Sequence, residues 1–249
     1  MIIRPFNFPH LMLLACAVAA VVIIRIILRK ANESTRKWTV IAICGLNIIA
    51  FFIYKAALSA DTEFLDAAGI TQFNWFNELP IQLCNINMFL IPIGLITGKR
   101  GLLGFSFFVA PLGALMAVFF PEPAFTGFPL TIPRIMGFYG THLLIFVCAL
   151  SLATLGLYRP RLKDFPQILI TFIILSVVMH GVNLILRATV CPFANYFFTF
   201  HADISILNLF WSWIPVPLLY LLPGLAILLA YMGLVSLFFV IPDAIRKKS

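Results

Sequence analysis

Residues 166–187 read PQILITFIILSVVMHGVNLILR, and this stretch decides the class of fold. It carries no formally charged residue between Pro166 and Arg187. About 20 consecutive, predominantly apolar residues are enough for a helix to cross the roughly 30 Å hydrocarbon core of a bilayer. We therefore predict that residues 166–187 form a transmembrane helix.

Similar apolar stretches occur along the whole chain. Of its 249 residues, 62% are hydrophobic and only 10% are charged, and the mean hydropathy of +1.06 lies far outside the range of soluble domains. So many stretches recur that we interpret the first as a retained helix and not as a cleaved signal peptide. The predicted spans lie at about 11–29, 38–58, 79–97, 102–120, 135–157, 166–187 and 214–240. The sequence thus predicts an all-α, polytopic membrane protein in which residues 1–249 form a single domain of seven transmembrane helices.

The basic residues predict its orientation. Most of the 17 Lys and Arg residues lie in the connections 25–37, 99–100 and 159–163 and in the tail 246–248. Because positively charged loops remain in the cytoplasm, an odd number of spans places the N-terminus outside and the C-terminus in the cytoplasm. We expect a multi-pass protein of the cell membrane, namely the bacterial cytoplasmic membrane. The net charge of +8 then reflects topology, and no nucleic-acid partner is expected.

Two longer external segments, about 59–78 and 188–213, carry tryptophans and other aromatic residues. Such segments are typical of interfacial belts or of short amphipathic helices that lie on the outer surface. We expect no separate soluble domain in either.

The five cysteines do not form a metal or disulfide pattern. Cys16, Cys44, Cys84 and Cys148 fall inside predicted spans, and Cys191 falls in an external loop. No Cys-x-x-Cys pair and no Cys/His spacing typical of zinc sites is present. We expect neither a metal nor a cofactor.

Polar residues gather at the start of the third predicted span. Gln82, Cys84, Asn85 and Asn87 follow Pro80 in its outer turns. At about 100° per residue they occupy opposite faces of a helix, which predicts a helix surrounded by neighbours. Polar groups inside a bilayer need a partner, a cavity or water, so this cluster is a candidate site.

Two other spans bring polar side chains to a similar depth. The fifth span begins near Tyr139, and at 1.5 Å per residue it places His142 roughly 10 Å below the outer boundary. The sixth span carries a polar stripe at helical spacing in its outer half, formed by Ser176, His180, Asn183 and Arg187.

Cys84 is a candidate nucleophile, with His142 or His180 as its base. A thiol with a pKa of about 8.5 needs an adjacent imidazole to become an effective thiolate near neutral pH. The alternative is that Cys84 fills space and that the histidines bridge helices through hydrogen bonds.

The remaining polar residues also have two interpretations. Arg187 offers paired donors that suit a lipid phosphate, but it is also placed as a cation that reaches from a helix end to the interface. Gln82, Asn85 and Asn87 could orient a histidine or an oxyanion, or simply join helices.

Several motifs resemble one family. The run Glu78-Leu-Pro-Ile-Gln-Leu-Cys84 resembles the LPxHLC signature of the YwaF-like bacterial integral membrane proteins, which are related to the eukaryotic transmembrane protein 164 acyltransferases. Here Gln82 stands where that family often has histidine. The resemblance covers about residues 78–240 and has three further parts: Pro121 followed by Phe138-Tyr-Gly-Thr-His142, the Trp/Pro segment 211–217, and a G-x-N-Y element that matches either Gly181-Val-Asn183 or Asn195-Tyr196.

The resemblance implies a seven-helix enzyme in which Cys84 and His142 act on lipid acyl chains. Eukaryotic members transfer acyl groups to lysophospholipids, and the more distant androgen-induced-gene-type hydrolases cleave fatty-acid esters with a threonine and a histidine. We therefore predict an acyltransferase or acyl-ester hydrolase whose partners are an acyl-donor lipid and an acyl-acceptor lipid. The predicted substrate-binding residues are Gln82, Asn85, Asn87, Tyr139, His180, Asn183, Arg187, Asn195 and Tyr196.

A transporter or ligand-binding membrane protein that uses the same polar cluster is the alternative. No carboxylate lies in the middle of a predicted span, which disfavours ion coupling through an acidic residue. The sequence makes no prediction about the oligomeric state.

Overall fold

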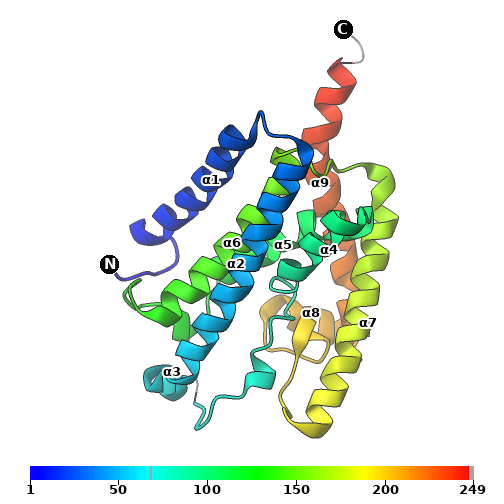
Figure 1. The fold of residues 1–249 in the computed structure, drawn as a ribbon. Helices are drawn as coiled ribbons and strands as arrows, with labels where there is room; N and C mark the ends of the chain where they lie inside the picture. The colour runs from blue at the N-terminus through cyan, green and yellow to red at the C-terminus, as the bar shows by residue number, and fades with distance from the viewer. Residues whose placement is uncertain (68, 247–249) are drawn as a thin grey trace.

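The computed structural model describes residues 1–67 and 69–246, and the elements it contains are helices (Figure 1). The long ones are α1 (Phe8–Leu28), α2 (Glu33–Ser59), α5 (Arg100–Phe119), α6 (Pro133–Thr154), α7 (Phe165–Thr189) and α9 (Leu222–Arg246). Shorter α-helices are α3 (Thr62–Ala67), α4 (Asn87–Thr97) and α8 (Ser205–Trp213). Single 3-10 turns are η1 (Trp75–Asn77), η2 (Pro123–Phe125), η3 (Leu162–Asp164), η4 (Tyr196–Phe198) and η5 (Leu219–Leu221).

Within the described residues, six helices are long and apolar enough to cross a membrane. They correspond to six of the seven predicted spans, so the all-α, multi-pass class is confirmed. The predicted external segments 59–78 and 188–213 contain the short helices α3 and α8, as expected for such segments.

The third predicted span, 79–97, differs from expectation. Only its second half is a helix, the 11-residue α4, and residues 79–86 form a series of turns. Pro80 has no amide hydrogen to donate, and the Leu79 amide donates to the Tyr196 hydroxyl at 2.9 Å, outside any helix. The polar side chains that precede α4 therefore sit on an irregular backbone, which is tolerated at membrane depth only where protein buries it.

The last span also begins later than predicted, at Leu222 and not at residue 214. Pro215 and Pro217 cannot donate helical hydrogen bonds, and Leu218 has a φ of 64°, which interrupts the chain between α8 and α9. At the other end the α9 backbone continues to Arg246, while Lys247 and Lys248 of the predicted basic tail lie outside the described residues.

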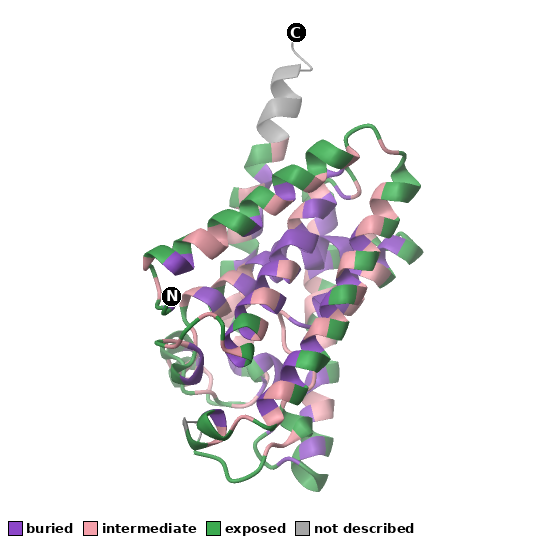
Figure 2. Cartoon of the chain, turned by 60° about the vertical axis from the view of Figure 1, so that its left-hand side comes forward, coloured by how far each residue is buried: buried purple, intermediate pink, exposed green. Residues whose placement is uncertain are grey.

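Helices α5 and α6 form the centre of the bundle. In their most apolar windows, 61% of α5 and 72% of α6 are buried, against 17% for α1, 22% for α7 and 17% for α9. Helix α6 packs against α1, α2 and α5, and Figure 2 shows the buried residues concentrated along this middle layer. The outer helices keep apolar side chains exposed, as helices that face lipid do.

The predicted cytoplasmic connections meet at one end of the bundle (top of Figure 1). Arg36 donates to the carbonyls of Leu28 and Leu155, at 3.2 and 3.1 Å. Arg100 pairs with Asp164, and the Arg159 guanidinium donates to the Phe239 carbonyl at 3.3 Å. The connections after α1, α4 and α6 and the outgoing part of α9 thus lie side by side.

Candidate functional site

Cys84 and His142 meet inside the bundle. Cys84 belongs to the turns before α4, His142 lies on α6, and the distance from Cys84 Sγ to His142 Nε2 is 3.6 Å. His142 Nδ1 lies 2.7 Å from the Phe138 carbonyl, one helical turn earlier. Because a carbonyl only accepts hydrogen bonds, Nδ1 carries the proton, and a neutral ring then presents an acceptor Nε2 to the thiol.

The surroundings of the pair exclude most solvent. His142 is buried and Cys84 half-buried, and the Phe138 ring lies 4.7 Å from the imidazole, centroid to centroid. On the other side, a Cβ built on Gly113 of α5 would lie 3.4 Å from Cys84 Cβ. Gly113 therefore places α5 directly beside the cysteine, and α5 and α6 enclose the pair.

The turns that carry Cys84 are held from outside by the segment after α7. The Tyr196 hydroxyl accepts from the Leu79 amide and donates to the Phe76 carbonyl at 2.8 Å. The Phe197 amide donates to Gln82 Oε1 at 3.2 Å. Burial raises the pKa of the Tyr196 phenol well above its ordinary value, so this side chain remains a neutral donor. Tyr196 and Gln82 therefore position the turns.

An ion pair between buried Lys55 of α2 and half-buried Glu78 holds the same turns. Lys55 Nζ binds the Glu78 carboxylate just before Leu79, and it lies 4.7 Å from the centroid of the Tyr54 ring. Glu122 is exposed, but desolvation by the protein around it raises its pKa, and the nearby Glu78 carboxylate raises it further. Lys55 is not among the site residues predicted from the sequence, although a lysine inside an apolar helix is itself a signal of function.

The two asparagines beside Cys84 differ in how they are held. The Asn87 amide donates to the carbonyls of Leu83 and Cys84, at 2.8 and 3.2 Å. Asn85 is 8% exposed, and its Oδ1 has no hydrogen-bond partner within the described part of the chain. Asn85 is therefore the amide next to the cysteine that remains available to another molecule.

The polar stripe of α7 binds the loop that follows it. Asn183 donates to the Tyr196 carbonyl and to Thr199 Oγ1, both at 2.8 Å, and accepts from the Tyr196 amide at 2.8 Å. His180 Nδ1 lies 3.1 Å from the same Thr199 Oγ1. Of the two histidines considered for Cys84, His142 is the one adjacent to it.

Arg187 and Asn195 also contact this loop. Arg187 donates to the Ala194 carbonyl at 3.2 Å and lies over the Phe200 ring at 4.4 Å. Asn195 Oδ1 accepts from the Phe200 amide at 2.9 Å, and its amide donates to the Phe200 carbonyl at 3.1 Å. Sequence reasoning did not single out Thr199, which joins His180 to Asn183, because nothing in its local pattern marks it.

Tyr139 lies on α6 one turn before His142. Its ring is buried beside that of His10, at 6.1 Å between centroids, and its hydroxyl has no partner among residues 1–67 and 69–246. His10 Nε2 lies 3.1 Å from the Val118 carbonyl, so His10 is engaged by α5.

No group of three or more His, Cys, Asp or Glu side chains suited to a metal ion is found among the residues that the structure describes. The chemistry that the chain itself places here is that of a thiol and an imidazole.

Comparison with protein families now adds to this geometry. The model of the TMEM164 family matches residues 5–237. The chain belongs to the TMEM164 family. In this family member the matched region contains the Cys84–His142 pair, the turns before α4 and the loop after α7. No curated protein and no solved structure matches the chain significantly.

Proposed function

We propose that this protein is a membrane-embedded lipid acyltransferase or acyl-ester hydrolase in which Cys84 is the nucleophile and His142 the base. The observation that carries the proposal is the 3.6 Å contact between Cys84 Sγ and His142 Nε2 in a site enclosed by α5 and α6. A nucleophile within reach of a base that a third group orients is the usual arrangement for covalent catalysis. Here the Phe138 carbonyl is the orienting group.

The first half-reaction loads the acyl group. His142 Nε2 removes the thiol proton while Cys84 Sγ attacks the ester carbonyl carbon of the donor lipid, forming a tetrahedral oxyanion. The carbon–oxygen ester bond then breaks, and the leaving alcohol oxygen takes the proton from His142. The products are a thioester on Cys84 and a lysolipid.

The second half-reaction transfers the acyl group from Cys84 to an acceptor. His142 removes a proton from the hydroxyl of an acceptor lipid, whose oxygen attacks the thioester carbonyl. The carbon–sulfur bond breaks and the proton returns to the sulfur. An acceptor lipid gives transfer and water gives hydrolysis, so the shielding of the pair favours transfer.

Asn85 is the best-placed donor for the oxyanion. It adjoins Cys84, and no group of the described residues holds its Nδ2, the atom that would donate, whereas Gln82 and Asn183 are bound to the loop after α7. A preorganised amide donor in a water-poor site stabilises the charge that develops on the carbonyl oxygen.

We also propose how many times the chain crosses the membrane and on which side each terminus lies. With the turns 79–86 and α4 counted as one crossing, the chain passes the bilayer seven times, with its N-terminus outside and its C-terminus in the cytoplasm. The clustering of basic residues around Arg36, Arg100 and Arg159 at one end supports this orientation in the cell membrane.

The test is acyl transfer by the purified protein, with an isotope-labelled donor phospholipid and a lysophospholipid acceptor. Wild type is expected to form labelled product and a hydroxylamine-sensitive acyl adduct on Cys84, whereas Cys84→Ala forms neither. Cys16→Ala, which alters an exposed cysteine of α1, is the matched control and keeps full activity. Full turnover by Cys84→Ala would refute the assignment and favour a binding or transport role for the same cluster.

A further inference from the structure

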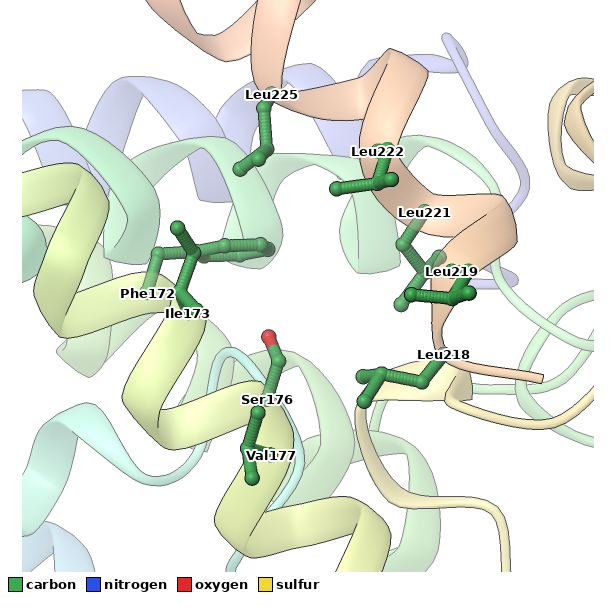
Figure 3. A pocket seen from close by; sticks show the side chains of 9 residues that line it. All are labelled: Phe172, Ile173, Ser176, Val177, Leu218, Leu219, Leu221, Leu222 and Leu225. Carbon is green, nitrogen blue, oxygen red and sulfur yellow. The ribbon is translucent and has the colours of Figure 1, made fainter. Parts of the chain in front are cut away.

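A cavity lies between the middle of α7 and the start of α9, apart from the Cys84–His142 pair. It has a volume of about 130 Å³. Phe172, Ile173 and Val177 line it from α7, and Leu222 and Leu225 line it from α9 (Figure 3). For scale, an apolar protein cavity of about 150 Å³ accommodates a benzene molecule.

One polar side chain enters this apolar space. Ser176 is 5% exposed, and Figure 3 shows its hydroxyl directed from α7 toward the leucines of α9. Within the described ranges that hydroxyl has no hydrogen-bond partner. Thr171, on the same helix, donates instead to the Gln167 carbonyl at 2.7 Å. A buried hydroxyl without a partner is unfavourable, so an occupant that supplies an acceptor would be stabilised.

The rim of the cavity faces the lipid side of the bundle. Ile173 and Val177 are 45% and 54% exposed on α7, and Leu219 and Leu222 are 48% and 50% exposed beside α9. In a membrane protein these apolar residues contact hydrocarbon chains and not water. A trapped water is also disfavoured, because a buried water needs two to four polar partners and the lining residues offer one hydroxyl.

We propose that the cavity between α7 and α9 binds the acyl end of a membrane lipid, with a carbonyl oxygen accepting a hydrogen bond from Ser176. The methylenes next to the carbonyl fill the apolar space, and the rest of the chain runs along the exposed leucines and isoleucines. The chemistry recognised is a carbonyl attached to a long hydrocarbon chain, which a lipid ester and a protonated fatty acid share. This site does not depend on catalysis by Cys84.

Photolabelling of the full-length protein in lipid nanodiscs tests the location. The probe is a palmitic acid with a diazirine near its carboxyl group, in competition with unlabelled palmitic acid. Labelled peptides are expected to cover residues 172–177 and 218–225. Leu225→Phe fills the cavity and is expected to abolish the labelling, whereas Ile227→Phe adds the same ring at an exposed position of α9 outside the cavity and leaves it unchanged. Equal labelling of both variants, or labelling elsewhere only, overturns the site.

Ser176→Ala tests the recognition of the carbonyl and is a small change in a buried position. Loss of one hydrogen bond is expected to weaken competition by palmitic acid or methyl palmitate about three- to tenfold. Competition by hexadecane, which has no oxygen, should not change. If methyl palmitate competes as well as the acid, lipid esters are the natural source; if only the acid competes, free fatty acids are. An unchanged affinity for both oxygen-bearing competitors in Ser176→Ala refutes the role of the hydroxyl.

Discussion

At the scale of single residues, Asn85 is distinctive because it adjoins the nucleophile and neither its Oδ1 nor its Nδ2 is held by another group of the described chain, whereas Asn87 is held through its Nδ2. We predict that Asn85→Ala lowers the rate of acyl-thioester formation about 100- to 1,000-fold, the usual effect of removing an oxyanion donor. The rate is measured by single-turnover trapping of the adduct. Asn87→Ala and Gln82→Ala are not suitable controls, since both side chains hold the turns. Cys16→Ala is the control and should leave the rate unchanged. Unchanged trapping in Asn85→Ala would contradict the role.

Also at the scale of single residues, Glu122 predicts how the stability of the fold depends on pH. Its pKa is raised in the folded state, first by desolvation from the protein around this exposed side chain and then by Glu78, while Lys55 opposes the shift. A carboxyl group whose pKa is higher in the folded state stabilises the fold while it is protonated. This stabilisation is complete below the pKa of the unfolded state, about 4.5, and is lost as the pH rises through the pKa of the folded state.

Glu122→Gln should therefore raise the thermal unfolding temperature at pH 7 and have little effect at pH 4, where both side chains are neutral. Intrinsic tryptophan fluorescence in detergent measures the midpoint. A stabilisation that is equal at both pH values would show that ionisation of Glu122 is not the cause.

At the scale of elements, the contact between α2 and α6 depends on Gly137. A Cβ built there would lie 2.4 Å from Tyr54 Cδ2, so the helices cannot keep their separation with a larger residue. We predict that Gly137→Ala destabilises the fold by about 1–3 kcal/mol, the usual cost of overpacking.

Gly140 is the matched control for Gly137, because it lies one turn later on α6 and has open space where its Cβ would be. Gly140→Ala should be neutral or slightly stabilising in the same thermal assay. If both variants behave alike, the close contact with Tyr54 does not limit the packing.

The ion pair between α2 and the turns before α4 gives a second prediction for elements. Lys55→Met leaves the half-buried Glu78 carboxylate unpaired, and loss of a hydrogen bond to a charged group costs about 1.5–3 kcal/mol. The double variant Lys55→Met/Glu78→Gln removes both charges and should recover most of that loss. Chemical or thermal unfolding compares the three proteins, and equal stability of the single and double variants would show that the charge pairing is unimportant.

At the scale of the whole molecule, orientation can be tested with single cysteines and a membrane-impermeant maleimide. Asp203→Cys lies in the segment before α8 and Lys30→Cys in the connection after α1, and both positions are exposed. We predict labelling of Asp203→Cys in intact cells and of Lys30→Cys only after permeabilisation, with wild type as the background. The opposite pattern would reverse the proposed topology.

The sequence by itself determined that the chain is a helical membrane protein, because span length, apolar composition and loop charge are local properties that add along the chain. It also indicated Cys84 and His142 as a pair and left His180 as an alternative. Six of the spans could be located to within a few residues at most of their ends, since nothing outside a span is needed to recognise it.

Only the tertiary structure decided which side chains meet. It placed Cys84 on turns and not on a helix, because Pro80 and the Tyr196 hydroxyl divert the backbone there. It assigned His142 to the cysteine and His180 to Thr199, and it paired Lys55 with Glu78. These partners depend on how each helix is rotated and how deep it lies relative to its neighbours, which no local pattern specifies.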